Sequence, residues 1–307
     1  MSYIVRTRHV TKSFQGKDVV SDVSMNIRKG EIYGFLGPNG AGKTTLMKMI
    51  TNLVKPSSGE IEIFGQKLAN SSFDILKRMG SIIEYPVFYD KLTALENLEL
   101  HCEYMGHTDK RAIHEALELV NLQYIDRKAV QHFSLGMKQR LGIARAMITK
   151  PELLILDEPI NGLDPMGIKE MRDIFKTLSE RYGITLLISS HILGEIEQIA
   201  DTVGVITGGK LVEEVSMDTI RQRNTDYIEL VTSDCRKASH VLEHTLRHFD
   251  YKAVDGRTIR IYKPNLVPSD ILRALVMEGV DIDSFSKQTG SLEHYFIELI
   301  QGGHVYA

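Results

Sequence analysis

One segment restricts the possible folds more than any other feature of this sequence: residues 37–44 read Gly-Pro-Asn-Gly-Ala-Gly-Lys-Thr. This is the phosphate-loop pattern, with two fixed glycines before a lysine and a hydroxyl residue. Glycines let backbone N–H groups turn inward and approach a triphosphate closely, and the N-terminus of a following helix adds partial positive charge. The segment therefore predicts a nucleotide site in an α/β fold.

The residues on either side supply the context that the motif requires. Residues 30–37 are typical of a strand that leads into the loop, and residues 44–53 predict a helix that ends before Pro56. This context disfavours the alternative, a glycine-rich turn with a solvated lysine. We expect Lys43 to contact the β- and γ-phosphates and the Thr44 hydroxyl to bind Mg²⁺. The predicted nucleotide-binding residues are Gly37, Pro38, Asn39, Gly40, Ala41, Gly42, Lys43, Thr44 and Thr45.

Two neighbouring carboxylates, Asp157 and Glu158, follow an apolar run over residues 153–156. Such a run predicts a buried parallel strand, and α/β proteins place their ligands at the carboxyl ends of these strands. We expect Asp157 to hold Mg²⁺ and Glu158 to act as the general base that polarises the attacking water. The alternative is an acidic turn after an ordinary strand, and the phosphate loop in the same chain disfavours it.

The pattern of elements divides the chain into two parts. Residues 1–219 alternate short β-like runs with helical patterns, which predicts an α/β domain with a mostly parallel sheet and covering helices. Residues 220–307 predict a small α+β domain with the order β-α-β-β-α-β of a ferredoxin-like unit. Its elements are expected at residues 227–231, 238–249, 251–254, 258–262, 271–277 and 282–285, with a closing helix at 292–300.

Composition and charge bear on the possible partners. Lys and Arg number 37 and Asp and Glu 40, so the formal net charge is −3 and the basic character of a nucleic-acid binder is missing. No apolar run approaches the ~18 residues of a membrane-spanning helix, and the N-terminus lacks the pattern of a secretion signal. We therefore expect a soluble protein that would act at a membrane only through a partner. Cys102 and Cys235 lie in no metal-ligand spacing, which favours a reducing compartment.

Residues 133–140, Phe-Ser-Leu-Gly-Met-Lys-Gln-Arg, resemble the signature segment of ATP-binding-cassette (ABC) ATPases, usually Leu-Ser-Gly-Gly-Gln before a basic residue, Gln and Arg. Ser134 and Gly136 match this pattern, whereas Leu135 and Met137 depart from its Gly and Gln. The resemblance implies that the Ser134 hydroxyl and the Gly136 N–H bind the γ-phosphate of ATP held by a second copy of the chain. An ordinary helix cap at Ser134 is the alternative.

Three further segments resemble parts of the ABC cassette. Residues 161–164, Asn-Gly-Leu-Asp, resemble the loop that crosses the dimer interface with its aspartate, here Asp164. His191 follows the next apolar strand and resembles the switch histidine that contacts the γ-phosphate. Phe14 lies where the family stacks an aromatic ring on adenine, with a core aromatic as the alternative.

Glu84 lies where the family usually has a glutamine that contacts Mg²⁺ and the transmembrane partner, so the resemblance implies a metal set of Thr44, Asp157 and Glu84. With glutamate at this position, the segment resembles the ATPases of bacitracin and lantibiotic exporters. Residues 88–89, 92–98 and 134–140, and the Ser-Leu-Glu-His-Tyr-Phe segment at 291–296, strengthen that resemblance.

The resemblance implies a P-loop ABC ATPase cassette with a helical subdomain, ATP and Mg²⁺ as cofactors, and export of bacitracin or a related peptide antibiotic, which would confer resistance. The implied partners are a separate polytopic membrane permease and a second copy of the chain, with no nucleic acid and no direct membrane insertion. The implied location is the cytoplasmic face of the cell membrane. One alternative is an ABC ATPase that acts on the ribosome or DNA, which the single cassette disfavours. A P-loop kinase would leave the Ser134 segment unexplained.

Overall fold

In the computed structural model, the phosphate-loop segment joins a buried strand to a helix, as the sequence predicts. Strand β4 (Ile32–Leu36) is buried along its whole length, and helix α1 (Lys43–Ile50) begins at the motif lysine. Both elements are shorter than predicted. Gly30 has a left-handed backbone before the strand (φ 84°), and Asn52 adopts the same conformation after the helix (φ 60°), which is a common way for a helix to end.

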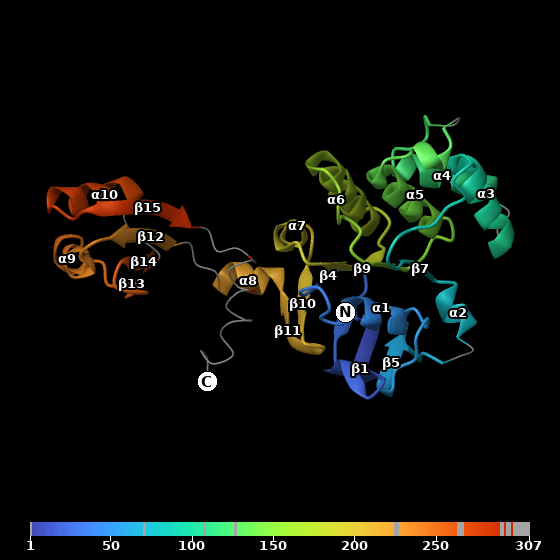
Figure 1. Ribbon diagram of the computed structural model, residues 1–307, viewed down its shortest axis with the longest axis horizontal. Coiled ribbons are helices and arrows are strands. Elements are labelled where there is room, and N and C mark those ends of the chain that lie inside the picture. The colour runs from blue at the N-terminus through green and yellow to red at the C-terminus, as the bar shows by residue number, and fades with distance from the viewer. Residues whose placement is uncertain are drawn as a thin grey trace. The chain divides into compact units, whose positions relative to one another are not determined.

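The structure describes residues 2–69, 72–106, 109–125, 128–223, 227–262 and 267–288, together with Leu292 and Phe296. By its internal contacts the chain separates into two units, Met1–Met217 and Asp218–Ala307 (Figure 1). The boundary expected between residues 219 and 220 falls within helix α8 (Met217–Arg223). Each unit has a sheet and a hydrophobic core of its own.

The larger sheet of the first unit has six strands in the order β11-β10-β4-β9-β8-β7. Neighbours pair in parallel from β10 to β7, and the edge strand β11 is antiparallel. The carboxyl ends of β4, β7, β8 and β9 therefore lie along one edge of the sheet, where the predicted site residues follow them. Besides β4, the strands are β7 (Met79–Ile82), β8 (Leu153–Leu156), β9 (Thr185–Ser190), β10 (Thr202–Thr207) and β11 (Lys210–Ser216).

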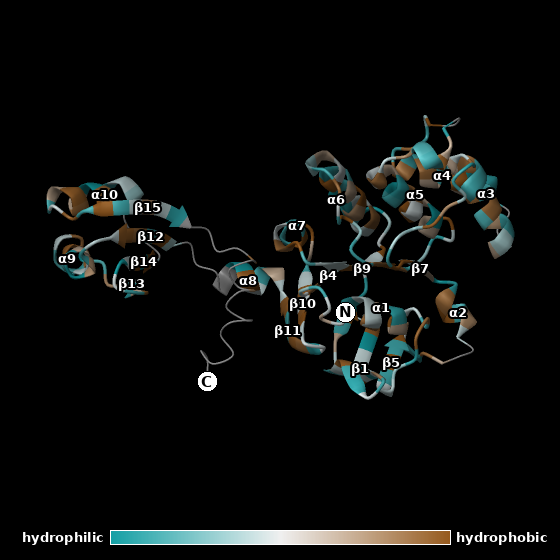
Figure 2. Ribbon diagram, viewed as in Figure 1, coloured by the Kyte–Doolittle hydropathy of each residue, from teal (hydrophilic) through white to brown (hydrophobic). Residues whose placement is uncertain are grey.

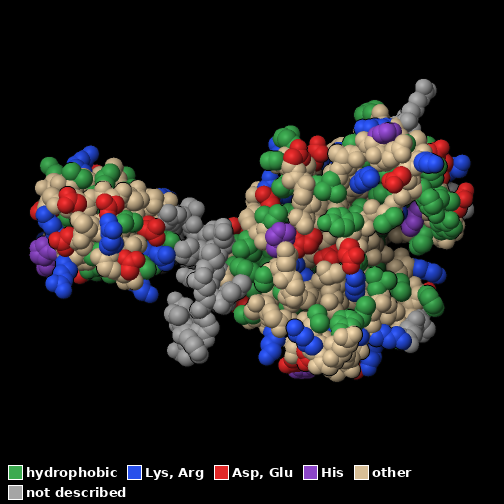
Figure 3. All heavy atoms as spheres, in the orientation of Figure 1, with side chains coloured by type: hydrophobic (Ala, Val, Ile, Leu, Met, Phe, Trp, Pro, Cys, Tyr) green, Lys and Arg blue, Asp and Glu red, His purple; other side chains and the backbone are tan. Residues whose placement is uncertain are grey.

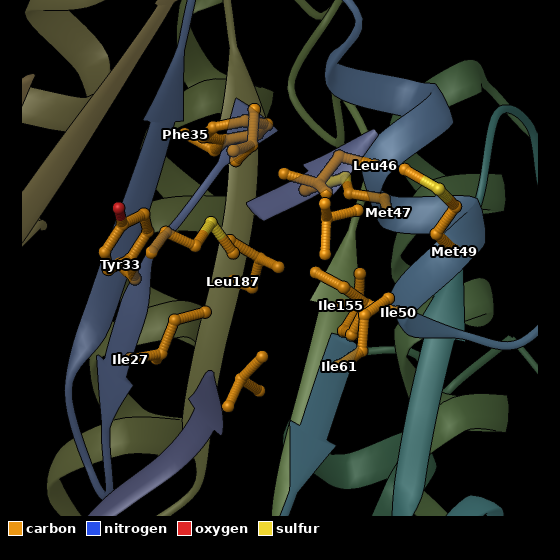
Figure 4. Packing of buried hydrophobic residues seen from close by; sticks show 14 of the residues in the cluster. Ile27, Tyr33, Phe35, Leu46, Met47, Met49, Ile50, Ile61, Ile155 and Leu187 are labelled. Carbon is orange, nitrogen blue, oxygen red and sulfur yellow. The ribbon is translucent and has the colours of Figure 1, made fainter. Parts of the chain in front are cut away.

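A second, antiparallel sheet contributes to the same core. Its strands are β1 (Tyr3–Phe14), β2 (Lys17–Val23), β3 (Asn26–Arg28), β5 (Ser58–Ile63) and β6 (Gln66–Lys67). Figure 4 shows side chains of α1, among them Leu46 and Ile50, in one cluster with Ile61 of β5 and Ile155 of β8. Burying each such side chain contributes about 1.5–3 kcal/mol, so packing fixes the helix that carries Lys43.

Helices α3 (Ala94–Met105), α4 (Lys110–Leu119) and α5 (Leu135–Met147) pack against one another and form the expected helical subdomain. Both hydrophobic and hydrophilic residues lie on each of them in Figure 2, the pattern of helices with one buried face. Other helices of this unit are α2 (Phe73–Leu76), α6 (Pro165–Glu180) and α7 (Leu193–Glu197), with a 3-10 turn at Val130–His132. Across the described residues, no helix combines the length and apolar character needed to cross a membrane.

The second unit has the element order that the sequence predicts. Strand β12 (Tyr227–Thr232) lies between β14 and β15, and all pairs of the sheet β13-β14-β12-β15 are antiparallel, which is the ferredoxin-like arrangement. Its other elements are α9 (Cys235–His240), a π-helical turn (Val241–Thr245), β13 (Tyr251–Ala253), β14 (Thr258–Tyr262), α10 (Pro268–Met277) and β15 (Ile282–Gln288). The expected closing helix at 292–300 lies outside the described residues, apart from Leu292 and Phe296.

Candidate active site

The phosphate loop depends on glycine at several positions. Gly40 and Gly42 have left-handed backbones, with φ of 78° and 105°. A Cβ atom on Gly42 would lie 2.7 Å from the carbonyl oxygen of Val19, and one on Gly37 would lie 2.3 Å from that of Ile206. Backbone from strands β2 and β10 therefore encloses the loop and leaves no room for side chains there.

Lys43 is buried at the first turn of α1, with only 5% of its surface exposed. Its Nζ donates to the carbonyl oxygens of Gly37 at 2.7 Å and Pro38 at 3.3 Å. The same nitrogen lies 3.1 Å from Oε1 of Glu158, an ion pair without the geometry of a hydrogen bond. The loop thus wraps around the ammonium group, and Thr45 lies half-buried nearby on the same turn of the helix. This arrangement presents a fixed cation at the mouth of an anion-binding loop.

Asp157 is buried at the end of β8, where two hydroxyl groups hold its carboxylate. Thr44 Oγ1 donates to Oδ2 at 2.7 Å, and Ser189 Oγ donates to Oδ1 at 2.6 Å. A carboxylate and a hydroxyl in contact are hard oxygen ligands that fit Mg²⁺, which usually takes one or two protein ligands and completes its shell with phosphate oxygens and water. Among the described residues there is no group of three or more His, Cys, Asp or Glu side chains that could hold a metal ion.

Glu158 and His191 meet although they follow different strands. Nδ1 of His191 lies 2.8 Å from Oε2 of Glu158, and the backbone N–H of Glu158 donates to Ser189 Oγ at 2.9 Å. Sequence reasoning did not identify Ser189, which is fully buried and contacts both neighbouring acids. The Ser-Ser-His run at the end of β9 could have indicated Ser189, but a function was predicted there for His191 alone.

Ser134, Gly136 and Asp164 lie in segments that contact each other. Ser134 caps α5 by accepting from the N–H of Met137 at 3.3 Å, and Asp164 caps α6 by accepting from that of Gly167 at 2.9 Å. The Leu135 side chain comes within 3.2 Å of the position that a Cβ on Gly162 would occupy. In the described structure Ser134 and Asp164 act as helix caps, and Gly136 lies in the first turn of α5. None of the three joins the Lys43 cluster in the described contacts, so their nucleotide role stays a prediction.

Phe14 and Glu84 both lie outside the cluster around Lys43 and Asp157: Phe14 has an exposed ring, and Glu84 is paired with a lysine. Phe14, at the end of β1, is 47% exposed and has Lys12 Nζ 4.9 Å from its ring centroid, so it is not a core aromatic. Glu84 follows β7, and its Oε1 contacts Nζ of Lys48 at 2.6 Å. The structure therefore pairs Glu84 with a lysine one helical turn after Thr44, and its role as a metal ligand stays a prediction.

The fold and site together define the class. A phosphate loop meets a buried aspartate, a glutamate and a histidine at the ends of β8 and β9, as in a P-loop nucleoside triphosphatase. The helical subdomain between β7 and β8, which carries the Ser134 segment, makes it a cassette of the ABC type.

The chain belongs to the ATP-binding proteins of ABC transporters. The ABC transporter family model matches residues 20–161. The chain is 61% identical over 307 residues to the uncharacterized ABC transporter ATP-binding protein YcbN of Bacillus subtilis (strain 168), covering 100% of both chains. It is 47% identical to the bacitracin transport ATP-binding protein BcrA of Bacillus licheniformis, covering 99% of this chain and 100% of that one.

The first unit of the chain also resembles a solved cassette that is a dimer. The dimeric ATP-binding cassette MJ0796, in a post-hydrolysis state bound to ADP and Pi, matches with a TM-score of 0.63 at 26% identity and covers 69% of this chain and 98% of that one. As a member of this family, the chain binds nucleotide, hydrolyses ATP and serves a transporter. Dimerisation and a membrane permease partner are general features of such subunits.

Proposed function

We propose that this chain is the ATP-hydrolysing subunit of an exporter that removes bacitracin or a related peptide antibiotic from the cell and so confers resistance. The observation that carries the proposal is the full-length likeness to the bacitracin transport protein, at 47% identity over 305 residues. The likeness includes the ferredoxin-like unit and is not confined to the cassette that ABC ATPases share. Contact with the peptide would fall to a separate polytopic permease.

In this proposal the chain is a peripheral protein at the cytoplasmic face of the membrane. Two copies related by a two-fold axis would enclose two ATP molecules. Ser134 and Gly136 of one copy would then contact the γ-phosphate bound by the other, with Asp164 at the interface. On the face shown in Figure 3, acidic and basic side chains are interspersed over both units, which gives no support to a nucleic-acid partner.

Nucleotide binding would use the contacts already present at the phosphate loop. A triphosphate would replace the loop carbonyls and Glu158 as the partner of Lys43, since phosphate oxygens carry more negative charge. The backbone N–H groups of the loop and the N-terminus of α1 would add further donors. Phe14 has an exposed ring that can stack on adenine.

Hydrolysis would then depend on Glu158. Thr44 and Asp157 would hold Mg²⁺, which when bound neutralises charge on the phosphates. Release from Lys43 would leave the Glu158 carboxylate able to take a proton from the attacking water. His191, at 2.8 Å from the other carboxylate oxygen, would fix the orientation of that base and reach the γ-phosphate.

Expression in bacitracin-susceptible cells tests the proposal. Cells that express the chain together with its permease should tolerate more bacitracin than cells that express either protein alone. Lys43→Ala, which removes the fixed cation, should abolish the gain. Equal tolerance from the ATPase alone would contradict the proposal that this chain drives a permease. Tolerance to a lantibiotic but not to bacitracin would keep the proposed mechanism and identify a different substrate. Co-purification with ribosomes or DNA, and not with membranes, would favour a non-transport ABC ATPase.

A further inference from the structure

Lys48 and Glu84 form an ion pair beside the proposed metal site. Lys48 lies four residues after Thr44 on α1, so the two side chains emerge on the same face of the helix. The Lys48 Nζ is 2.6 Å from Oε1 of Glu84, and the two side chains are 32% and 60% exposed. Since Thr44 donates to Asp157, Glu84 and Asp157 approach α1 at successive turns of one face.

The backbone fixes the point from which the Glu84 side chain starts. The carbonyl oxygen of Ile82, at the end of β7, accepts from the N–H of Asp157 at 2.9 Å, so the loop leaves the sheet beside Asp157. Glu84 has a φ of 65°, a conformation that a residue with a Cβ adopts when its surroundings enforce it. With the backbone fixed, the side-chain rotamer decides which partner the carboxylate meets.

The charges around this pair change when nucleotide and metal bind. A triphosphate brings several negative charges to the N-terminus of α1, and an unpaired carboxylate nearby would repel it. Lys48 reduces that repulsion by holding the carboxylate in an ion pair. Mg²⁺ prefers carboxylate oxygens and gives Glu84 a second possible partner. An ion pair this exposed changes an equilibrium by about fivefold at most, or about 1 kcal/mol, so a divalent cation can displace it.

We infer that Lys48 is a positioning residue that holds the Glu84 carboxylate aside and releases it to Mg²⁺ when the metal–nucleotide complex binds. The inference rests on the proposed function, specifically on Mg²⁺ bound at Thr44 and Asp157. Its consequence is that Lys48 sets how strongly nucleotide binding depends on the metal. Lys48 thereby lets a carboxylate occupy the position without excluding the triphosphate.

Titration calorimetry of the purified full-length chain with a non-hydrolysable ATP analogue, in chelator and in Mg²⁺, tests the inference. Lys48→Met leaves Glu84 charged and unpaired, so binding in chelator should weaken about fivefold while binding in Mg²⁺ changes less than about twofold. Lys48→Arg keeps the charge and should match the wild type in both conditions. Glu84→Gln removes the carboxylate charge, so it should bind the analogue more tightly in chelator.

The double variant Lys48→Met/Glu84→Gln separates the ion pair from a direct attraction between Lys48 and the triphosphate. If Lys48 acts through Glu84, the Lys48→Met change should have little effect on binding in chelator once Glu84 is neutral. The same fivefold loss in both backgrounds would show that Lys48 acts on the nucleotide itself and would overturn the inference. Wild-type affinity that is equal in chelator and in Mg²⁺ would instead contradict the proposed metal site.

Discussion

At the residue scale, the carboxylate of Glu158 lies between a buried ammonium group and an imidazole. Its two oxygens lie 3.1 Å from Lys43 Nζ and 2.8 Å from His191 Nδ1. Its backbone has a φ of 49°, and its N–H donates to Ser189. Residues from two separate segments, the start of α1 and the end of β9, thus fix both the main chain and the side chain of Glu158. Such placement suits a general base, because proton transfer requires the base within hydrogen-bonding reach of the water.

Ser189→Ala should weaken the response to Mg²⁺ and lower stability. The substitution removes the donor to Asp157 and the acceptor of the Glu158 N–H, and each buried group left unsatisfied costs about 1–3 kcal/mol. We expect a lower melting temperature and a higher Mg²⁺ concentration for half-maximal ATP hydrolysis. Ser190→Ala is the matched control, because that buried hydroxyl bonds to the backbone of Ile192. An unchanged Mg²⁺ response in Ser189→Ala would show that Ser189 does not position the acids.

At the scale of elements, the site exists because parallel strands bring their carboxyl ends to one edge. β4 leads into the phosphate loop, and β8 and β9 lead into Asp157 and His191. The loop between β4 and α1 is confined by backbone from β2 and β10. The shape of the loop therefore depends on strands distant in sequence as well as on its own glycines.

Gly42→Ala should abolish high-affinity ATP binding and destabilise the chain by about 2 kcal/mol or more, because the new Cβ meets both a left-handed backbone and the Val19 carbonyl oxygen. Gly16→Ala is the matched control. Gly16 also has a positive φ, 79°, but a Cβ atom added there would have no neighbour within 4 Å in the described part of the chain, so only the backbone cost of about 1–2 kcal/mol applies. Urea denaturation and ATP titration of both variants check this prediction. Equal losses in the two variants would show that the enclosing strands have no effect.

At the scale of the whole molecule, one chain supplies only part of the predicted ATP site. Ser134 and Gly136 lie at the N-terminal end of α5, in a segment that contacts the loop before α6. The contacts described for this segment do not include Lys43. The solved ATP-binding cassette MJ0796 is dimeric, and the predicted role of this segment likewise requires a second copy of the chain. The first unit matches that cassette, while the second unit adds a separate ferredoxin-like core.

Glu158→Gln should bind ATP and hydrolyse it about 10²–10⁴-fold more slowly, because an amide cannot accept the proton of the attacking water. The trapped complex should accumulate as an ATP-bound dimer, detectable by light scattering with and without the permease.

Adding Gly136→Ala to Glu158→Gln should prevent that dimer, because the new methyl group would block the approach of the γ-phosphate. Among the described residues, a Cβ at this position meets only Leu163, at 3.7 Å, and alanine favours a helix, so monomer stability should not fall. Dimers of the double variant would contradict the proposed role of Gly136.

The sequence by itself determined the features that depend on local pattern. The phosphate loop, its strand and its helix follow from residues 30–53, because glycine spacing and apolar periodicity act over a few residues. Alternating elements predicted the α/β domain with its mostly parallel sheet, and the order β-α-β-β-α-β in the second unit is confirmed with the strand order of a ferredoxin-like sheet. Element ends were less accurate, because single left-handed residues such as Asn52 set them.

Only the tertiary structure decided which side chains meet. Ser189 contacts Asp157 and Glu158 across 32 and 31 positions of the sequence, and Lys48 pairs with Glu84 across 36 positions. No local pattern predicts these contacts, because they depend on the register of parallel strands and on where α1 packs against the sheet. The sequence shows which chemical groups the chain carries, but the free energy of packing distant segments determines the distances between them.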